Sequence, residues 1–524
     1  MNTITLSLRQ FATPFIWRNA ALLASLAVLS DALFWQHALG VNVVIATAAI
    51  TTALLVRTGG AIAMEAKAML VAMAVCSAMI VVHGSSLAIT LTILWLVVFS
   101  GFMLAPGLRN VLSATGQALH NLASVPLAFA EGLAQAVPEK GASRKGFSWL
   151  KLSLLPVLVL MAYYWIYRAA NPKFSAMTEG IMVRLADFID ALVRGLFTAH
   201  ALFLLLSAVA SGALLLKLAP GTVAAAEARL TDAMVRLRLK RPHWKSPLPM
   251  NALERERRIG LLLLVLVNAL LLLVNKIDID WVWFGFQVEE GFSLKQFVHQ
   301  GTWLLIISIL LSMAILLRLF RRNLNFHPRA FWLKRLALLW LAQNAVLAVS
   351  VFLRNMHYIG FHGLAYKRIG VIVFLALVVA GLATLAWKIH ARRSTFFLWR
   401  VNAWAAVAVL TMLSCFNWDR VIVKYNLGHP NPAEIDTDHY LALSDKVLPL
   451  LHLHRADVER QMAKHATNHV RWTDTQDPLV FNEALAAKTR IFLGRWQTNG
   501  WQSWTLAEQR TYDELVGLAA PNKP

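Results

Sequence analysis

The sequence predicts an all-α, polytopic membrane protein with about eleven transmembrane helices, followed by a small α-helical domain outside the membrane. Hydrophobic residues make up 58% of the 524 residues and charged residues only 15%, whereas a soluble domain usually carries about 25% charge. Apolar runs recur from Ala20 to Trp418. Each run is about long enough to cross a hydrocarbon core of roughly 30 Å as a helix. From Asp419 onward the composition becomes that of an ordinary soluble chain.

The predicted spans divide the chain into a transmembrane domain, residues 1–418, and a C-terminal domain, residues 419–524. Only a short Gly-Ser-Ser turn separates the third span from the fourth, so these two are expected to form a tight hairpin. The eleven predicted spans cover residues 19–36, 40–56, 68–83, 86–104, 149–167, 195–216, 259–275, 302–318, 336–353, 369–387 and 401–418.

The distribution of basic residues predicts the orientation. With the N-terminus in the cytoplasm, the inner segments hold 29 Lys and Arg residues and the outer loops hold 9. Cytoplasmic loops of membrane proteins carry such an excess, so the N-terminus is expected inside and the C-terminus outside. The first span lacks a clear small-residue cleavage site, which favours a retained anchor over a signal peptide.

Two further segments are predicted to be helices on the membrane surface. Apolar and charged residues interleave at steps of three and four over residues 174–192, which indicates an amphipathic helix on the outer face. Residues 110–136 give a weaker version on the inner face, interrupted by Pro126. Residues 217–258 form a basic inner loop with one expected helix and a Pro-rich turn.

The net charge of +22 does not indicate nucleic-acid binding. From Asp419 to the end, the chain holds 12 Lys and Arg against 13 Asp and Glu, so the excess lies in the first 418 residues. There it flanks apolar spans, as membrane orientation requires. The lipid bilayer is therefore the expected partner and nucleic acid is not.

The C-terminal domain is rich in Trp and His, and Thr505-Leu506-Ala507-Glu508 matches a capping box. Its near-neutral charge favours contact with a membrane or periplasmic protein partner.

Asp31 is the one acidic residue inside a predicted span. An intramembrane carboxylate is costly and often belongs to a proton or cation relay. The alternative is an Asp near a helix end that is hydrogen-bonded to a neighbour. No second carboxylate lies inside a predicted span, and the one Lys, Lys151, lies at the cytoplasmic edge of its span, which favours the alternative.

Two predicted outer loops carry the candidate ligand-binding residues. Asp278 and Asp280 follow the seventh span, at a spacing that can hold a divalent cation and a pyrophosphate. Solvated loop acids are the simpler interpretation. Arg354, His357 and Arg368 follow the ninth span and can bind a phosphate or carboxylate headgroup. The alternative there is an interfacial belt of aromatic and basic side chains.

The sequence assigns no catalytic residue, no cofactor and no metal site. Cys76 and Cys415 both fall inside apolar runs, so a Cys-based metal site is not expected. Four histidines of the C-terminal domain could form pairs but lack a metalloprotease pattern, and surface positions are the simpler interpretation. These are His452, His454, His465 and His469.

Four stretches of the sequence together resemble a known family. In order and spacing they are similar to multi-pass bacterial inner-membrane proteins catalogued only as a domain of unknown function. The resemblance covers roughly residues 150–455 and implies a bacterial inner-membrane location, but it brings no activity, cofactor or catalytic residue. The stretches are Ala170–Phe174, Glu256–Gly260, Arg354–Arg368 with its Tyr358-Ile359 and Gly363-Leu364 pairs, and Asn417–Leu427 followed by residues 435–444.

These observations favour a non-enzymatic multi-pass membrane protein that acts in envelope assembly, in signalling or as a partner subunit. The alternative is an enzyme or a flippase that acts on a lipid-linked anionic substrate at the outer face. The sequence leaves open which of the two is correct.

Overall fold

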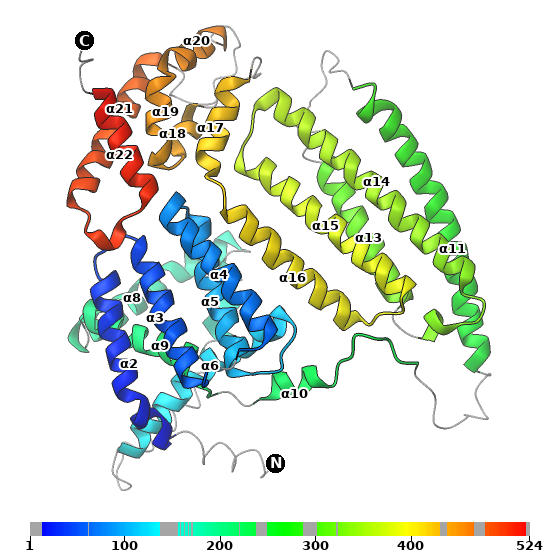
Figure 1. The fold of residues 1–524 in the computed structure, drawn as a ribbon, viewed down its shortest axis with the longest axis horizontal. Coiled ribbons are helices and arrows are strands. Elements are labelled where there is room, and N and C mark those ends of the chain that lie inside the picture. Colours follow the sequence, from blue (N-terminus) through cyan, green and yellow to red (C-terminus); the bar gives the residue numbers. More distant parts are fainter. Residues whose placement is uncertain are drawn as a thin grey trace.

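The computed structural model describes residues 13–60, 62–136, 156–168 (except 158, 162 and 166), 171–196, 198–218, 221–236, 249–286, 301–320, 323–429, 437–465 and 477–519. Helices and their connecting turns make up these residues, and no strand occurs among them, which confirms the all-α class. Figure 1 shows two helical bundles side by side, with a group of shorter helices at one end.

The N-terminal bundle is built around one buried helix. Its helices are α2 (Thr13–Phe34), α3 (Val41–Arg57), α4 (Met64–His83), α5 (Ser86–Leu104), α6 (Val111–Ala136) and α9 (Ala199–Leu215). Helix α5 contacts α3, α4, α6 and α9. Its buried side chains include Trp95, Phe99 and Phe102, which form the centre of the largest hydrophobic core.

The second bundle is built around α14 (Phe331–His362). The other helices are α11 (Pro249–Asp278), α13 (Thr302–Leu319), α15 (Tyr366–His390) and α16 (Thr395–Ser414). Helix α14 packs on α11, α13 and α15. Amide side chains join α14 to α11, since Asn275 Nδ2 donates to the carbonyl O of Gln343 at 3.1 Å and Gln343 Nε2 donates to Asn268 Oδ1 at 2.8 Å. Such bonds hold helices together where lipid provides no hydrophobic driving force.

Helix α16 joins the two bundles. Its Leu398 belongs to the core of the second bundle, whereas its Val407 belongs to the core around α5. Trp404 also stacks on Phe102 of α5, with ring centroids 5.9 Å apart. The two bundles are therefore packed against each other through this helix.

The C-terminal helices lie at one end of both bundles, which we call the C-terminal face (Figure 1). They share a core with the transmembrane helices, because Ile369 of α15 packs among Ile422, Leu448, Phe481 and Phe492. That the C-terminal region folds independently stays a prediction. The C-terminal helices are α17 (Trp418–Gly428), α18 (Thr437–Ala442), α19 (Leu448–Leu453), α20 (Arg455–His465), α21 (Pro478–Thr498) and α22 (Leu506–Ala519), with the short turns η4 (Asp445–Val447) and η6 (Trp501–Ser503).

The opposite end of the bundles, which we call the basic face, is joined by α10 (Thr222–Ala228) and the residues after it. Glu227 accepts a hydrogen bond from the backbone N of Arg109 at 2.6 Å, and Asp232 binds Arg400 at 2.6 Å. Three connecting segments that the charge count assigns to the same side of the membrane therefore meet at one end of the molecule.

Seven described helices are long and apolar enough to cross a membrane, which indicates a membrane protein. Three further predicted spans correspond to shorter apolar helices, Asn19–Phe34, Val41–Arg57 and Ala199–Leu215. The predicted span at residues 149–167 lies largely outside the described residues, so the count of eleven stays a prediction. The seven helices are Met64–His83, Ser86–Leu104, Leu253–Trp283, Thr302–Leu319, Phe331–His362, Tyr366–His390 and Thr395–Ser414.

The two predicted surface segments are both helical but differ in packing. Helix α8 (Pro172–Leu196) exposes Met177 and Ile181, as an amphipathic helix would, and its place on the outer membrane surface stays a prediction. Helix α6 continues through Pro126 and buries Asn121 against α9, where the Asn121 amide donates to the carbonyl O of Leu216 at 2.6 Å. One side of α6 therefore packs on the bundle, and the place of residues 110–136 on the inner membrane surface stays a prediction.

Candidate functional site

Asp278 and Arg354 form a buried ion pair where α11 and α14 lie side by side. Arg354 Nη2 donates to Asp278 Oδ1 at 2.5 Å, and the two side chains are 9% and 5% exposed, respectively. Asp278 is the last residue of α11, and Arg354 lies about two turns before the end of α14. Each charge would be costly to bury without the other. Two residues that the sequence places in separate loops therefore converge.

His357 lies one turn further along α14 and contacts the same neighbouring segment. Its Nε2 is 3.0 Å from the carbonyl O of Val282, and its ring stacks on Phe286 with centroids 4.3 Å apart. Val282 belongs to η1 (Ile279–Trp283), a π-helical turn that continues α11. Trp283 in the same turn donates to Ser350 Oγ at 2.9 Å. These contacts fix the end of α11 against α14.

The other two predicted site residues lie apart from this pair. Asp280 is 68% exposed and is 4.0 Å from Lys276. Arg368 donates to the carbonyl O of His362 at 2.8 Å and to that of Gly363, and its guanidinium lies over the ring of Tyr358. The structure thus brings together Asp278, Arg354 and His357, places Arg368 at the C-terminal end of α14, and leaves Asp280 in solvent.

The two predicted ligand-binding loops are helical at these residues. Asp278 ends α11 and Asp280 lies in η1, while α14 continues past its predicted end at residue 353 to His362. Hydropathy marks the apolar length that crosses the membrane, and a helix can extend beyond it as long as polar side chains find partners. The interpretation of Asp278 as a solvated loop acid is therefore wrong, because its side chain is buried.

The turn between α14 and α15 is held by Asn426 of α17. Gly363 has φ +77°, which side chains rarely adopt, and a Cβ there would lie 2.6 Å from Asn426 Oδ1. Asn426 accepts a hydrogen bond from Leu364 N at 2.5 Å and donates one to Leu364 O at 3.0 Å. One amide therefore satisfies both backbone groups of a turn residue, as buried polar groups require.

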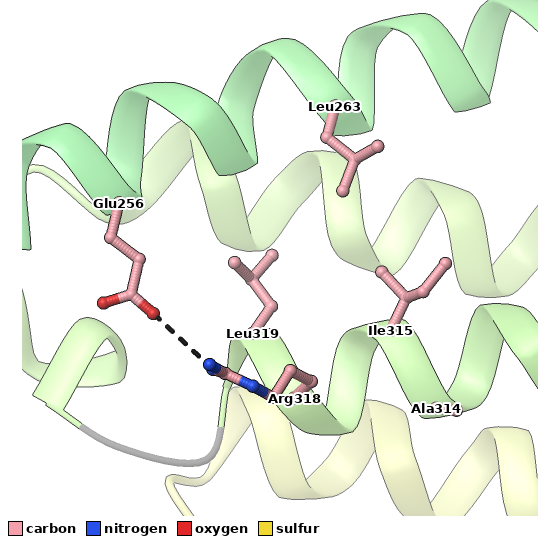
Figure 2. Close-up of a pocket in the computed structure, with 6 residues that line it drawn as sticks. All are labelled: Glu256, Leu263, Ala314, Ile315, Arg318 and Leu319. Atoms are coloured by element: carbon pink, nitrogen blue, oxygen red, sulfur yellow. Dashed lines mark ion pairs between the residues drawn. The ribbon is translucent and has the colours of Figure 1, made fainter.

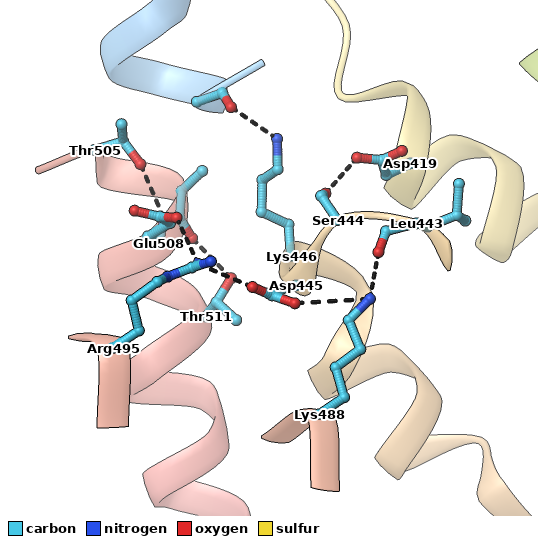
Figure 3. Close-up of polar contacts among 12 residues, drawn as sticks. Asp419, Leu443, Ser444, Asp445, Lys446, Lys488, Arg495, Thr505, Glu508 and Thr511 are labelled. Atoms are coloured by element: carbon cyan, nitrogen blue, oxygen red, sulfur yellow. Dashed lines mark hydrogen bonds and ion pairs between the residues drawn. The ribbon is translucent and has the colours of Figure 1, made fainter. Parts of the chain in front are cut away.

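Asp419 links the same region to the C-terminal helices. The hydroxyl of Tyr366, the first residue of α15, donates to Asp419 Oδ1 at 2.5 Å. The hydroxyl of Ser444 donates to the other carboxylate oxygen (Figure 3). Two of the stretches that carry the family resemblance, Arg354–Arg368 and the one from Asn417 to Ser444, therefore meet in space.

Lys446 fastens the C-terminal helices to the turn between α4 and α5. Its ammonium donates to the carbonyl O of His83 at 2.9 Å and to that of Gly84 at 3.1 Å. Both carbonyls lie at the C-terminal end of α4, where backbone acceptors have no hydrogen-bond partner within the helix. Burial lowers the pKa of the Lys446 ammonium, although Asp419, Glu508 and Asp445 act in the opposite direction.

A second group of charges lies beside Lys446 (Figure 3). Arg495 binds Asp445 at 2.9 Å and Glu508 at 3.2 Å, and Lys488 lies 3.6 Å from Asp445. Burial raises the pKa of the Glu508 carboxyl, with the neighbouring cations opposing it. The hydroxyl of Thr505 accepts a hydrogen bond from Glu508 N at 3.3 Å, as the predicted capping box requires. We call Asp445, Lys446, Lys488, Arg495 and Glu508 the junction network.

A third contact fastens the turn between α2 and α3. Val41 N donates to the carbonyl O of Trp504 at 3.2 Å, and Ser503 Oγ donates to the carbonyl O of Ala38 at 3.1 Å. A Cβ on Gly40 would lie 2.4 Å from the Ser503 carbonyl O, so the two backbones approach closely. The C-terminal helices therefore hold three turns of the C-terminal face at once.

Asp31 has a polar neighbour. Its Oδ1 lies 2.5 Å from His200 Nε2 of α9, and Trp35 stacks on the same imidazole at 4.4 Å. This contact supplies the hydrogen-bonded neighbour that the alternative expects.

Two of the four C-terminal histidines bind nearby side chains. His452 contacts Thr489 Oγ1 at 2.9 Å, and burial lowers its pKa, whereas His454 pairs with Asp457 at 3.0 Å. His469 lies outside the described residues. Among the residues that the structure describes, no three His, Cys, Asp or Glu side chains are placed to hold a metal ion.

Sequence reasoning missed the roles of Tyr366, Asp419, Asn426 and Lys446. Three of them lie within the stretches that carry the family resemblance and Lys446 lies just after one, yet their partners are between 25 and 363 residues away along the chain. One signal was available: Asp419 and Asn426 are seven residues apart in the sequence, a step that places two residues on one face of a helix.

The fold and the contacts define a helical membrane protein whose C-terminal helices are fastened to the transmembrane helices. Residues 19–453 match the model of the family described as "Domain of unknown function (DUF4153)", so the chain belongs to that family. The match confirms the resemblance inferred from the sequence and extends it over the N-terminal bundle. Searches of the curated proteins and of the solved structures gave no match.

Proposed function

We propose that the protein is a partner subunit of an assembly in the bacterial inner membrane, and that its C-terminal helices contact a second protein on the outer side. The observation that carries this proposal is that these helices are fastened to the transmembrane helices at three turns and still expose apolar side chains. The excess of basic residues in the predicted inner segments, 29 against 9, supports the orientation.

Helix α21 provides the apolar surface for this contact. Val480, Ala484, Ala487 and Ile491 follow one another at steps of four, three and four residues, which places them along one side of the helix. Ile491 is 70% exposed and Val480 is 40% exposed. Outside the bilayer, covering such side chains is favourable because apolar surface leaves water.

The charge of this region supports a protein as the partner. Residues 419–524 hold 12 basic and 13 acidic side chains, so long-range attraction to nucleic acid or to anionic lipid is weak. Lys446 and Asn426 bind the turns that end α4 and α14. A partner that moves the C-terminal helices would therefore also move the ends of these transmembrane helices. This arrangement suits a subunit in envelope assembly or signalling.

Crosslinking in native membranes tests the proposal. A photo-reactive residue at position 491 of the full-length chain should give one discrete protein adduct, and Ile491→Glu should abolish copurification of that protein. The matched control Glu483→Gln, at an exposed position elsewhere on α21, should leave it unchanged. Adducts with lipid alone, or copurification that survives Ile491→Glu, would overturn the proposal.

A second candidate is an enzyme or a flippase for a lipid-linked anionic substrate, supported by the convergence of Arg354 and His357 on α14. Such a substrate would have to replace Asp278 as the partner of Arg354. Binding of a polyprenyl phosphate to the full-length protein, strengthened by Asp278→Asn and lost in Arg354→Gln, would favour this candidate. Binding unaffected by either substitution would exclude this site.

A further inference from the structure

A cavity of about 350 Å³ lies between α11 and α13, towards the basic face. Figure 2 shows Leu263 and Ile315 facing each other across it, with Glu256 and Arg318 at one end. The volume is at the lower end of the 300–1,000 Å³ that ligand pockets usually have. The six lining residues are Glu256, Leu263, Ala314, Ile315, Arg318 and Leu319.

The packing of three helices explains why the cavity exists. Helices α11 and α13 both pack on α14 and touch each other much less. They approach closely at one level, where a Cβ on Gly260 would lie 2.9 Å from Leu319 Cδ1. Beyond this contact the small side chain of Ala314 leaves space between Leu263 and Ile315. The cavity is therefore an opening between two lipid-facing helices.

Its lining is amphiphilic. Most of the surface is aliphatic, and the charged end carries Arg318, whose side chain is 66% exposed. Among the described residues, Arg318 forms an ion pair with Glu256 alone, at 4.0 Å and with Glu256 itself 46% exposed, so this pair is loose. By contrast, Arg257 and Arg258 are bound to Glu254 at 2.7 and 2.9 Å. Arg318 is thus the cation beside the cavity with the weakest partner among these three.

We propose that this cavity binds an anionic phospholipid, with the phosphate at Arg318 and the first part of an acyl chain between Leu263 and Ile315. Basic residues at the end of an apolar crevice between transmembrane helices provide both parts of such recognition. The rest of the chain would continue along the exposed leucines of α11 and α13, such as Leu266 and Leu311, into the bilayer. Glu256 competes with the phosphate for Arg318, which predicts opposite effects of the two substitutions.

Native mass spectrometry of the full-length protein can test this. The protein is purified in detergent and titrated with phosphatidylglycerol or with phosphatidylcholine of the same acyl chains. We expect phosphatidylglycerol to bind more tightly, Arg318→Gln to weaken it about fivefold, as loss of one surface cation implies, and Glu256→Gln to strengthen it. Arg329→Gln, at an exposed position near the basic face but outside the cavity lining, is the matched control.

A variant that fills the cavity separates this site from general lipid contact. Ala314→Phe should reduce phosphatidylglycerol binding while the unfolding temperature shows that the protein is folded. The proposal is overturned if both lipids bind equally, if Arg318→Gln and Arg329→Gln have the same effect, or if a folded Ala314→Phe variant binds as the wild type does. If Ala314→Phe misfolds, the two charge variants decide the test: Arg318→Gln should weaken phosphatidylglycerol binding and Glu256→Gln should strengthen it.

Discussion

The C-terminal face contains two groups of charges that differ in burial and in the number of their contacts. Asp278 and Arg354 form a direct ion pair, 2.5 Å apart and almost fully buried, between two transmembrane helices. In the junction network, by contrast, Arg495 has two carboxylate partners and Lys446 binds two backbone carbonyls. When a charge has one main counter-charge, its loss leaves the other charge buried. When contacts are shared, a single loss is partly compensated by those that remain. The two groups should therefore respond differently to substitution.

The largest effect is expected from breaking the Asp278–Arg354 pair. Asp278→Asn or Arg354→Gln alone should lower the free energy of unfolding by about 3–5 kcal/mol, the usual cost of removing one member of a buried ion pair. The double substitution should cost less than the sum of the two single ones, because both charges are removed. Denaturant titration of the full-length protein in detergent measures this coupling.

The neighbouring exposed pair is the control for that experiment. Asp280 and Lys276 lie 4.0 Å apart and are 68% and 75% exposed, so Asp280→Asn should change the free energy of unfolding by no more than about 0.5 kcal/mol. Additive effects at Asp278 and Arg354 would mean that the two residues are not coupled, and the comparison between pair and network would then fail.

An intermediate effect is expected from Lys446→Met. The methionine fills similar space but leaves the carbonyls of His83 and Gly84 without this donor, which costs about 1–3 kcal/mol. Because Lys446 fastens the C-terminal helices to the turn after α4, these helices should also become more accessible to protease. Lys424→Met, at an exposed position on α17, is the control. Unchanged protease resistance in Lys446→Met would show that the other two turns suffice to hold the C-terminal helices.

The comparison also shows which features the sequence could predict. Hydropathy depends on local composition, so it located α5 and α13 within one residue and α4, α15 and the amphipathic helix α8 within four, whereas α14 extends nine residues past its predicted end. It could not find the Asp278–Arg354 pair, because charge counting treats both residues as parts of outer loops. Contacts such as Lys446 with His83, which are 363 residues apart, depend on how the helices pack. The family resemblance identified the stretches around Gly363 and Asn417 that take part in these contacts. It did not identify the residues that they contact.

The smallest effect is expected at Glu508, and its sign depends on pH. Burial raises the pKa of this carboxyl above its ordinary value of 4.5, because the ionised form is less favourable in the folded protein than in the unfolded chain. Above the raised pKa, Glu508→Gln removes this cost but also removes the contact with Arg495. We therefore expect a stabilisation of less than about 1 kcal/mol at pH 7.

Between the raised pKa and 4.5, the folded state of the wild-type protein binds more protons at Glu508 than the unfolded state does. Acidification through this range thus stabilises the wild type relative to the glutamine variant, and the difference between them should shrink. Unfolding temperatures of both proteins at pH 7 and at pH 5 measure this, since all other titrating groups are common to both. Glu483→Gln, an exposed carboxyl on α21, should show no such convergence. If Glu508→Gln instead destabilises the protein at pH 7, the ion pair with Arg495 contributes more free energy than the desolvation of the carboxylate costs. The shared contacts of the junction network would then be net stabilising at this residue.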